Sequence, residues 1–183
     1  EVEPIPGELI YRGYDINDLV DRVEKENRYG YEEVVYLLLF GNLPDKKELT
    51  EFKNMLSASR ELPESFAEDM ILKAPSRNIM NKMSRSVLAL YSYDDTAEDT
   101  SLKAEMHKAV NLIAKLPVIM TFAYQVQQRH YYNKSMIIHP LRPEEGTAQT
   151  ILSMLRMDRE YTPQEAHLLD VLLMLHAEHG GGN

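Results

Sequence analysis

The chain has 183 residues, which is enough to bury the core of one well-packed domain. With 44% hydrophobic and 27% charged residues, its composition is that of an ordinary globular protein. The formal net charge of −9 argues against a nucleic-acid partner, because no basic excess is available to displace counterions from phosphates. A small anionic substrate is still compatible with this charge, since a pocket can concentrate positive groups locally.

Cysteine is absent, which excludes both a disulfide framework and thiolate chemistry. We therefore expect a reducing, cytoplasmic setting. No apolar run approaches the roughly 20 residues that a membrane span requires, and the first residues show no signal-peptide pattern. We expect no membrane partner.

Extended structure is predicted only near the N-terminus. Residues 7–14 predict a short extended or hairpin element with Gly13 at its turn. A short helix is predicted over residues 16–23, with Asp15 or Asn17 as the residue that caps its first turn.

Two further helices are predicted over residues 31–40 and 46–57. Gly41 is the expected end of the first helix, and the apolar run before it predicts burial on nearly every face. Asp45 and Glu48 have the spacing of a capping pair at the start of the second helix.

Prolines and an apolar stripe mark the middle of the chain. Pro63 suits the first position of a helix over residues 63–73, and Pro75 closes that helix. A helix over residues 78–91 follows, with one apolar stripe made of Ile79, Met83, Val87, Leu88 and Tyr91.

The longest helical periodicity comes next, after an acidic link at residues 94–99. It continues from residue 101 to residue 130, and Pro117 is expected to kink or split the helix. A loop over residues 133–143 and a helix over residues 144–156 are then predicted.

The last helix has the clearest start. Thr162 can cap it, Pro163 suits its first position, and Glu165 can reach back to the cap. The helix should continue through Leu175. Eight or nine helices with short connections and no interdomain linker predict a single all-α domain over residues 1–183.

Two histidines, three glycines and an asparagine follow this last helix. His176 and His179 lie three residues apart, so they share one face of the helix. They are interpreted as a helix-terminal pair that suits the negative end of the dipole, as two of the ligands of a metal ion, or as hydrogen-bonding groups. No third metal ligand is recognisable by spacing, so we assign no metal site. Imidazoles, glycine amides and the Asn183 amide would together suit the oxygens of a small oxo-acid.

Four segments resemble landmarks of the citrate synthase family, in the family's order. They are Tyr11-Arg12-Gly13-Tyr14-Asp15-Ile16, residues 32–44, residues 108–117, and the octet over residues 176–183. The resemblance covers nearly the whole chain. It implies the first part of the multi-helical, all-α large domain of a citrate synthase.

The resemblance also implies roles for four residues. His179 matches the family's oxaloacetate-binding histidine, and Asn183 matches the asparagine beside it. His176 matches a histidine that we interpret as structural support for that pocket. Arg12 occupies a position that in some members lies close to the phosphates of coenzyme A; the alternative is a surface arginine beside a turn.

The activity implied by the resemblance is the condensation of oxaloacetate with acetyl-CoA to give citrate and CoA. Acetyl-CoA would be a co-substrate, and no tightly bound cofactor is expected. The resemblance places the catalytic histidines, aspartate and arginines beyond Asn183, together with the small domain and the later helices. The chain is therefore expected to be an incomplete domain that is inactive alone.

Other functions stay open on the sequence. The parent could be a 2-methylcitrate synthase that uses propionyl-CoA, since the acyl-pocket residues are not in the chain. A non-catalytic helical interaction module and a metal-binding helical protein are further alternatives. For the incomplete domain we expect a homodimer or a higher self-association, because its apolar helices should leave contiguous apolar surface for a second copy to cover; a monomer would favour the self-sufficient module.

Overall fold

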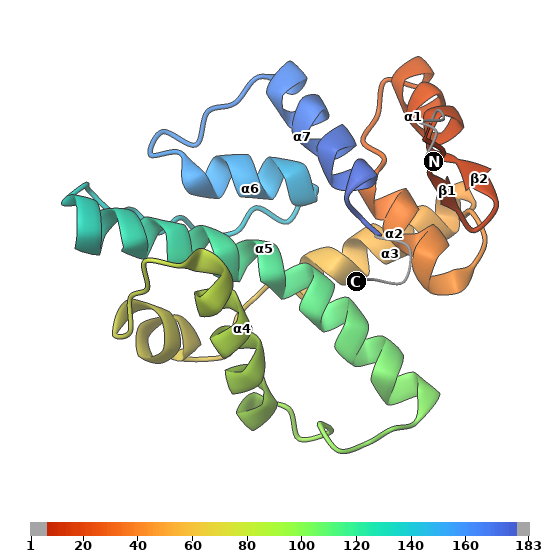
Figure 1. Ribbon diagram of the computed structural model, residues 1–183. Helices are drawn as coiled ribbons and strands as arrows, with labels where there is room; N and C mark the ends of the chain where they lie inside the picture. Colours follow the sequence, from red (N-terminus) through yellow and green to blue (C-terminus); the bar gives the residue numbers. More distant parts are fainter. Residues whose placement is uncertain (1–6, 179–183) are drawn as a thin grey trace, which may run out of the picture. The chain divides into compact units, whose positions relative to one another are not determined.

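The computed structural model describes residues 7–178 (Figure 1). These residues are mostly helical, with one two-stranded antiparallel hairpin near the N-terminus, so the all-α prediction with a short hairpin is confirmed. Backbone contacts divide the chain into two compact units. Unit 1 comprises residues 1–52 and 162–183, and unit 2 comprises residues 53–161. The single incomplete domain over residues 1–183 stays a prediction.

Unit 1 begins with the predicted hairpin. Its strands are β1 (Ile10–Tyr11) and β2 (Tyr14–Asp15), in which Tyr11 pairs with Tyr14. Three helices belong to this unit: α1 (Ile16–Lys25), α2 (Tyr31–Phe40) and α7 (Pro163–Leu175). Helix α3 (Lys46–Ala58) continues from unit 1 into unit 2.

Local capping chemistry sets the helix starts, as the sequence predicted. Asp15 accepts a hydrogen bond from the backbone N–H of Asn17 at the start of α1. Asp45 and Glu48 cap α3 reciprocally, and Thr162 and Glu165 do the same for α7. Each pair satisfies amide groups that have no partner within the helix.

The core of unit 1 joins the hairpin to all three of its helices. Apolar side chains from the hairpin, α1, α2 and α7 form one buried cluster: Tyr11, Ile16, Leu19, Val23, Val34, Leu37 and Met174. Residues near the two ends of the sequence thus share one core, which fixes the end of α7 against the N-terminal segment.

Unit 2 is built around a long central helix. Its elements are the π-helix η1 (Ala67–Leu72), α4 (Ile79–Leu90), the 3₁₀ turn η2 (Tyr91–Tyr93), α5 (Leu102–Tyr132) and α6 (Thr147–Leu155). Helix α5 contacts η1, α4 and α6. The core of unit 2 combines residues of α5 with residues in and before η1: Phe66, Ile71, Ile119, Ala123 and Val126.

Helix α5 bears on two sequence expectations. It continues through Pro117, so the helix is not split there, and a kink at the proline stays a prediction. Burial of Ala114, Val118 and Ile119 in unit 2 compensates for the lost hydrogen bond. By length and composition α5 would also suffice to cross a membrane, so the expectation that no segment is long and apolar enough was wrong. The core helix of a protein passes the same test, and α5 has that place in unit 2.

The helix predicted over residues 63–73 was also wrong in part. Ser65 adopts a left-handed backbone conformation (φ 59°), and the helical segment begins only at Ala67, as a π-helix. The ammonium of Lys82 on α4 donates to the carbonyl of Met70 and, at 2.8 Å, to the carbonyl of Ala74. This contact satisfies carbonyls that a regular helix would bond internally.

The stripe predicted for α4 was wrong at its C-terminal end. Leu88 is 76% exposed and Tyr91 is 58% exposed, whereas Ile79 and Met83 pack against the core of unit 2. Lys82 and Ser86 are buried instead. The hydrogen bonds of Lys82 to the η1 region turn this polar face of α4 inward.

Candidate functional site

The candidate site lies in unit 1, where α7 ends and the histidine-containing segment begins. Leu175 is the last residue of α7, and His176 is its C-cap. The backbone N–H of His176 donates to the carbonyls of Leu172 and Leu173, and its ring Nδ1 lies 2.7 Å from the Leu172 oxygen. Because a carbonyl only accepts, Nδ1 carries the proton in this contact and Nε2 remains available for a second interaction.

Tyr11 closes the end of the same helix. Its hydroxyl donates to the carbonyl of Met174 at 2.9 Å, with the Leu175 oxygen at 3.3 Å. These carbonyls belong to the last turn, where no backbone donor follows within the helix. The side chain is buried, and burial raises the pKa of its phenol, so the hydroxyl stays a donor over the neutral range.

Asp170 connects α7 to the start of α2. Its carboxylate accepts from the backbone N–H of Gly30 at 2.6 Å and from that of Tyr31 at 3.2 Å. A carboxylate suits the positive end of a helix dipole. Asp170 is nevertheless fully buried, and desolvation raises its pKa to about 6, although the two backbone hydrogen bonds act in the opposite direction.

Gly30 lets these elements come close together. A Cβ atom built on Gly30 would lie 2.5 Å from Cγ2 of Val23 and 2.8 Å from Sδ of Met174, both of which are buried. A methyl group therefore does not fit between α1 and α7. The absence of a side chain at this position fixes the spacing of the helices that hold His176.

Arg12 lies at the turn of the hairpin in a left-handed conformation (φ 51°). Its Nη2 donates to the carbonyl of Leu38 at 3.0 Å, near the C-terminal end of α2. The residue is exposed. It therefore binds the end of a helix, and the guanidinium, which has five N–H groups, retains donors for another ligand.

The structure brings together one of the four predicted site residues, His176, with two groups that the sequence reasoning missed. Tyr11 stands beside Arg12 in the motif, and Asp170 is a lone acid inside the apolar run of α7, a pattern that signals a buried partner. His179 and Asn183 lie outside the described residues. Within residues 7–178, no group of three or more His, Asp or Glu side chains could hold a metal ion.

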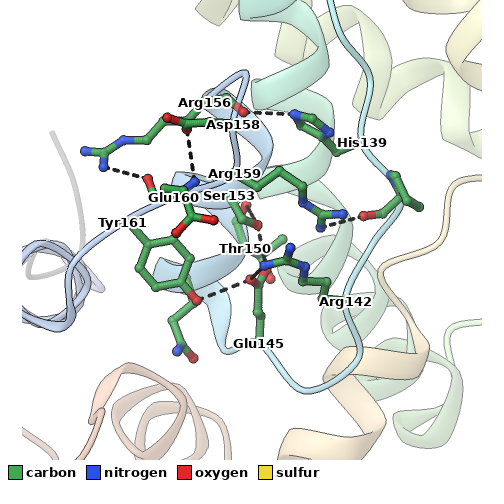
Figure 2. A network of polar contacts seen from close by, with 12 residues as sticks. His139, Arg142, Glu145, Thr150, Ser153, Arg156, Asp158, Arg159, Glu160 and Tyr161 are labelled. Carbon is green, nitrogen blue, oxygen red and sulfur yellow. Dashed lines mark hydrogen bonds and ion pairs between the residues drawn. The ribbon is translucent and has the colours of Figure 1, made fainter.

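A second polar cluster lies in unit 2, around Glu145. Figure 2 shows Arg142, Ser153 and Tyr161 converging on its carboxylate. The Ser153 hydroxyl is 2.5 Å from Oε2, and the Tyr161 hydroxyl is 3.2 Å from Oε1. The carboxylate is buried and has donors on both oxygens. We interpret it as a structural group that attaches residues 142–145 and Tyr161 to α6.

Comparison with known proteins identifies the family that these features belong to. The family described as citrate synthase, C-terminal domain, matches residues 1–183. Citrate synthase from Saccharolobus solfataricus is 32% identical over 174 residues, which cover 94% of this chain and 42% of that protein. Citrate/2-methylcitrate synthase from Bacillus subtilis is 26% identical over 172 residues, covering 94% and 43%. The chain thus spans less than half the length of these relatives.

Solved structures show the same fold. The crystal structure of citrate synthase from Pyrobaculum aerophilum matches with a TM-score of 0.79 and 28% identity, over 95% of this chain and 42% of that one. A citrate synthase from Thermoplasma acidophilum, solved as a ternary complex with carboxymethyl coenzyme A and oxaloacetate, matches with a TM-score of 0.75 and 22% identity, over 94% and 42%.

Proposed function

The chain belongs to the citrate synthase family, and on that premise we propose that it is part of an enzyme that condenses oxaloacetate with acetyl-CoA to give citrate and CoA. Its own contribution is one part of the oxaloacetate site. Acetyl-CoA is a co-substrate, and the enzyme needs no tightly bound cofactor. We place the enzyme in the cytoplasm.

The observation that carries this proposal is the fixed end of α7. Tyr11 bonds the last carbonyls of the helix, and the next residue, His176, bonds back to Leu172. The segment that contains His179 and Asn183 therefore leaves a helix end that is held in place. Such a support is what a pocket for a small ligand requires, because binding groups must be fixed within a fraction of an ångström.

We assign the roles of these residues from the resemblance to the family, and their chemistry agrees with it. His179 and Asn183 bind the oxygens of oxaloacetate, and glycines between them let the backbone approach the ligand. His176 is a support residue, which agrees with its bond to the Leu172 carbonyl. Arg12 contacts the CoA phosphates with the N–H groups that Leu38 does not use.

Catalysis needs an acid, a base and carboxylate-binding groups in one geometry, and each contributes about 10²-fold or more. Because the resemblance implies that these groups lie beyond Asn183, we propose that the 183-residue chain is inactive alone. The test is a thiol-release assay with oxaloacetate and acetyl-CoA on the full product of the gene and on the 183-residue chain. The proposal is supported if the full product is active and the 183-residue chain is not. Turnover by the 183-residue chain within tenfold of a full-length relative would contradict the proposed inactivity of that chain.

A second candidate is a 2-methylcitrate synthase that uses propionyl-CoA. The Bacillus subtilis relative, a citrate/2-methylcitrate synthase, is the observation that favours it. The same assay with propionyl-CoA separates the two, since the preferred acyl-CoA has the higher kcat/KM.

A non-catalytic helical module of the same fold is the alternative outside the enzymes. The gene sequence after Asn183 discriminates between them. Codons for further histidines, an aspartate and arginines support the enzyme, and a stop codon supports the module. For the enzyme we propose a homodimer, whereas a monomer would favour the module.

A further inference from the structure

Unit 2 contains a cavity of about 610 Å³ that none of the proposed chemistry uses. It lies between the C-terminal part of α4, the 3₁₀ turn η2 with the acidic link after it, and the first half of α5. These elements lie in the lower half of Figure 1. The volume is within the range of pockets that hold small organic ligands.

The segment over residues 108–117 supplies the polar wall of the cavity. Lys108, Asn111 and Lys115 all line it. Their spacing of three and four residues places them on one face of α5. This segment therefore faces a cavity with its polar side chains, whereas Val110 and Ala114 are buried.

The two lysines differ in their partners. Lys108 pairs with Glu105 at 3.0 Å and also donates to the carbonyls of Ala97 and Asp99. Lys115 donates to the Ser59 carbonyl at 2.9 Å and to Oδ1 of Asn111 at 2.8 Å, and no carboxylate lies within ion-pair distance of it in the described chain. An ammonium has three hydrogens, so one of them is left for a ligand.

Lys115 is partly buried, and this partial loss of hydration favours the binding of an anion. Desolvation lowers the pKa of Lys115, and no acidic side chain counteracts it. Lys82, which is buried in unit 2, donates to two backbone carbonyls and does not line this cavity. A partly desolvated cation beside open space gains free energy when an anion pairs with it.

The rest of the wall selects the shape and charge of that anion. Apolar side chains from α4 and α5 cover much of it, with two tyrosines at η2: Val87, Leu90, Leu112, Tyr91 and Tyr93. Asp94 and Asp95 also line the cavity and oppose a second negative charge. A singly charged acid with an apolar body fits this wall, and a phosphate dianion does not.

We propose that this cavity binds a small monocarboxylic acid with an aromatic or aliphatic body, whose carboxylate pairs with the ammonium of Lys115. The apolar body lies against Val87, Leu90 and Leu112. This site is independent of the oxaloacetate site proposed in unit 1.

The experiment titrates the ¹⁵N-labelled chain with phenylacetate and with its neutral isostere phenylacetamide, followed by amide NMR shifts. We expect phenylacetate to shift amides of residues 87–97 and 107–115, and phenylacetamide to bind at least about tenfold more weakly. Lys115→Met should raise the dissociation constant of phenylacetate at least about tenfold. Lys103→Met, an exposed control on the same helix, should change this constant less than about twofold.

Several results would overturn the proposal. They are the absence of shifts in these two segments, equal binding of the acid and the amide, the same shifts with inorganic phosphate, and unchanged binding in folded Lys115→Met. If Lys115→Met does not fold, the comparison of acid and amide on the unmodified chain decides the question.

Discussion

The hydroxyl of Tyr11 lies 2.9 Å from the carbonyl oxygen of Met174, across 163 positions of the sequence. This contact holds the end of α7 to the N-terminal hairpin. Tyr11→Phe removes this buried donor and leaves the Met174 carbonyl only the longer contact from the backbone N–H of Ala177, so we expect a loss of about 1 kcal/mol of unfolding free energy. Urea unfolding followed by circular dichroism measures it. Tyr14→Phe, at an exposed position of the same hairpin, should cost less than about 0.5 kcal/mol, and equal losses in both variants would contradict the role of the bond.

Gly30 is predicted to tolerate no side chain. Gly30→Ala places a methyl group against Val23 and Met174, at 2.5 and 2.8 Å from their nearest atoms, and overpacking of this kind costs about 1–3 kcal/mol. Gly7→Ala is the matched control, because nothing lies within 4 Å of its Cβ position. An alanine at residue 30 that is as stable as the control would show that α1 and α7 are not close-packed in solution.

Asp170 should make stability depend on pH in the acidic range. Its pKa is raised from 3.8 to about 6 in the folded chain, chiefly by desolvation. Between pH 3.8 and about 6 the folded chain keeps a proton that the unfolded chain has released. This proton contributes on the order of 3 kcal/mol to the free energy of unfolding. The contribution is fully present below about pH 4 and is lost as the pH rises through about 6.

The Asp170→Asn variant should lack this slope, because an amide does not titrate. Unfolding free energies of the two chains between pH 4 and 7 give the comparison, with Asp21→Asn as an exposed control on α1. Parallel pH profiles of the unmodified chain and Asp170→Asn would show that Asp170 does not titrate in this range.

Apolar side chains on one face of α7 give the predicted homodimer a concrete surface. Leu168, Leu172 and Leu175 are 63%, 43% and 39% exposed and are spaced four and three residues apart. We expect light scattering at micromolar concentration to show a dimer, with an interface on the order of 2,000 Å². Leu172→Glu should raise the dissociation constant of the dimer at least about tenfold. A monodisperse monomer would contradict the dimer.

Helix boundaries were predictable where their determinants are local. The capping pairs at Asp45 and Thr162 lie within four residues of the amides that they bind, so sequence spacing is sufficient to find them. The π-helix was not predictable, because the ammonium of Lys82 that bonds the Met70 carbonyl comes from another helix. The same long-range contact explains why the buried face of α4 was placed incorrectly at Leu88.

The order of the motifs pointed to His176 as a support residue and to His179 as a ligand-binding residue, and the second assignment stays a prediction. The contacts that hold the end of α7 were not predictable, because they join residues 139 to 164 positions apart. The position of Asp170 inside an apolar run indicates a buried partner, but it does not say that the partners are the amides of Gly30 and Tyr31. The motif around Tyr11 likewise does not say that its hydroxyl binds the end of α7.

The central claim is that the segment after α7 binds oxaloacetate in a working citrate synthase. The most direct measurement is the kcat/KM for oxaloacetate of the full gene product and of its His179→Gln variant, by thiol release with saturating acetyl-CoA. Loss of a hydrogen-bond donor to an oxygen of oxaloacetate predicts a decrease of at least about tenfold, whereas His167→Gln on α7 should stay within about threefold. Equal values for His179→Gln and the unmodified enzyme would contradict the claim.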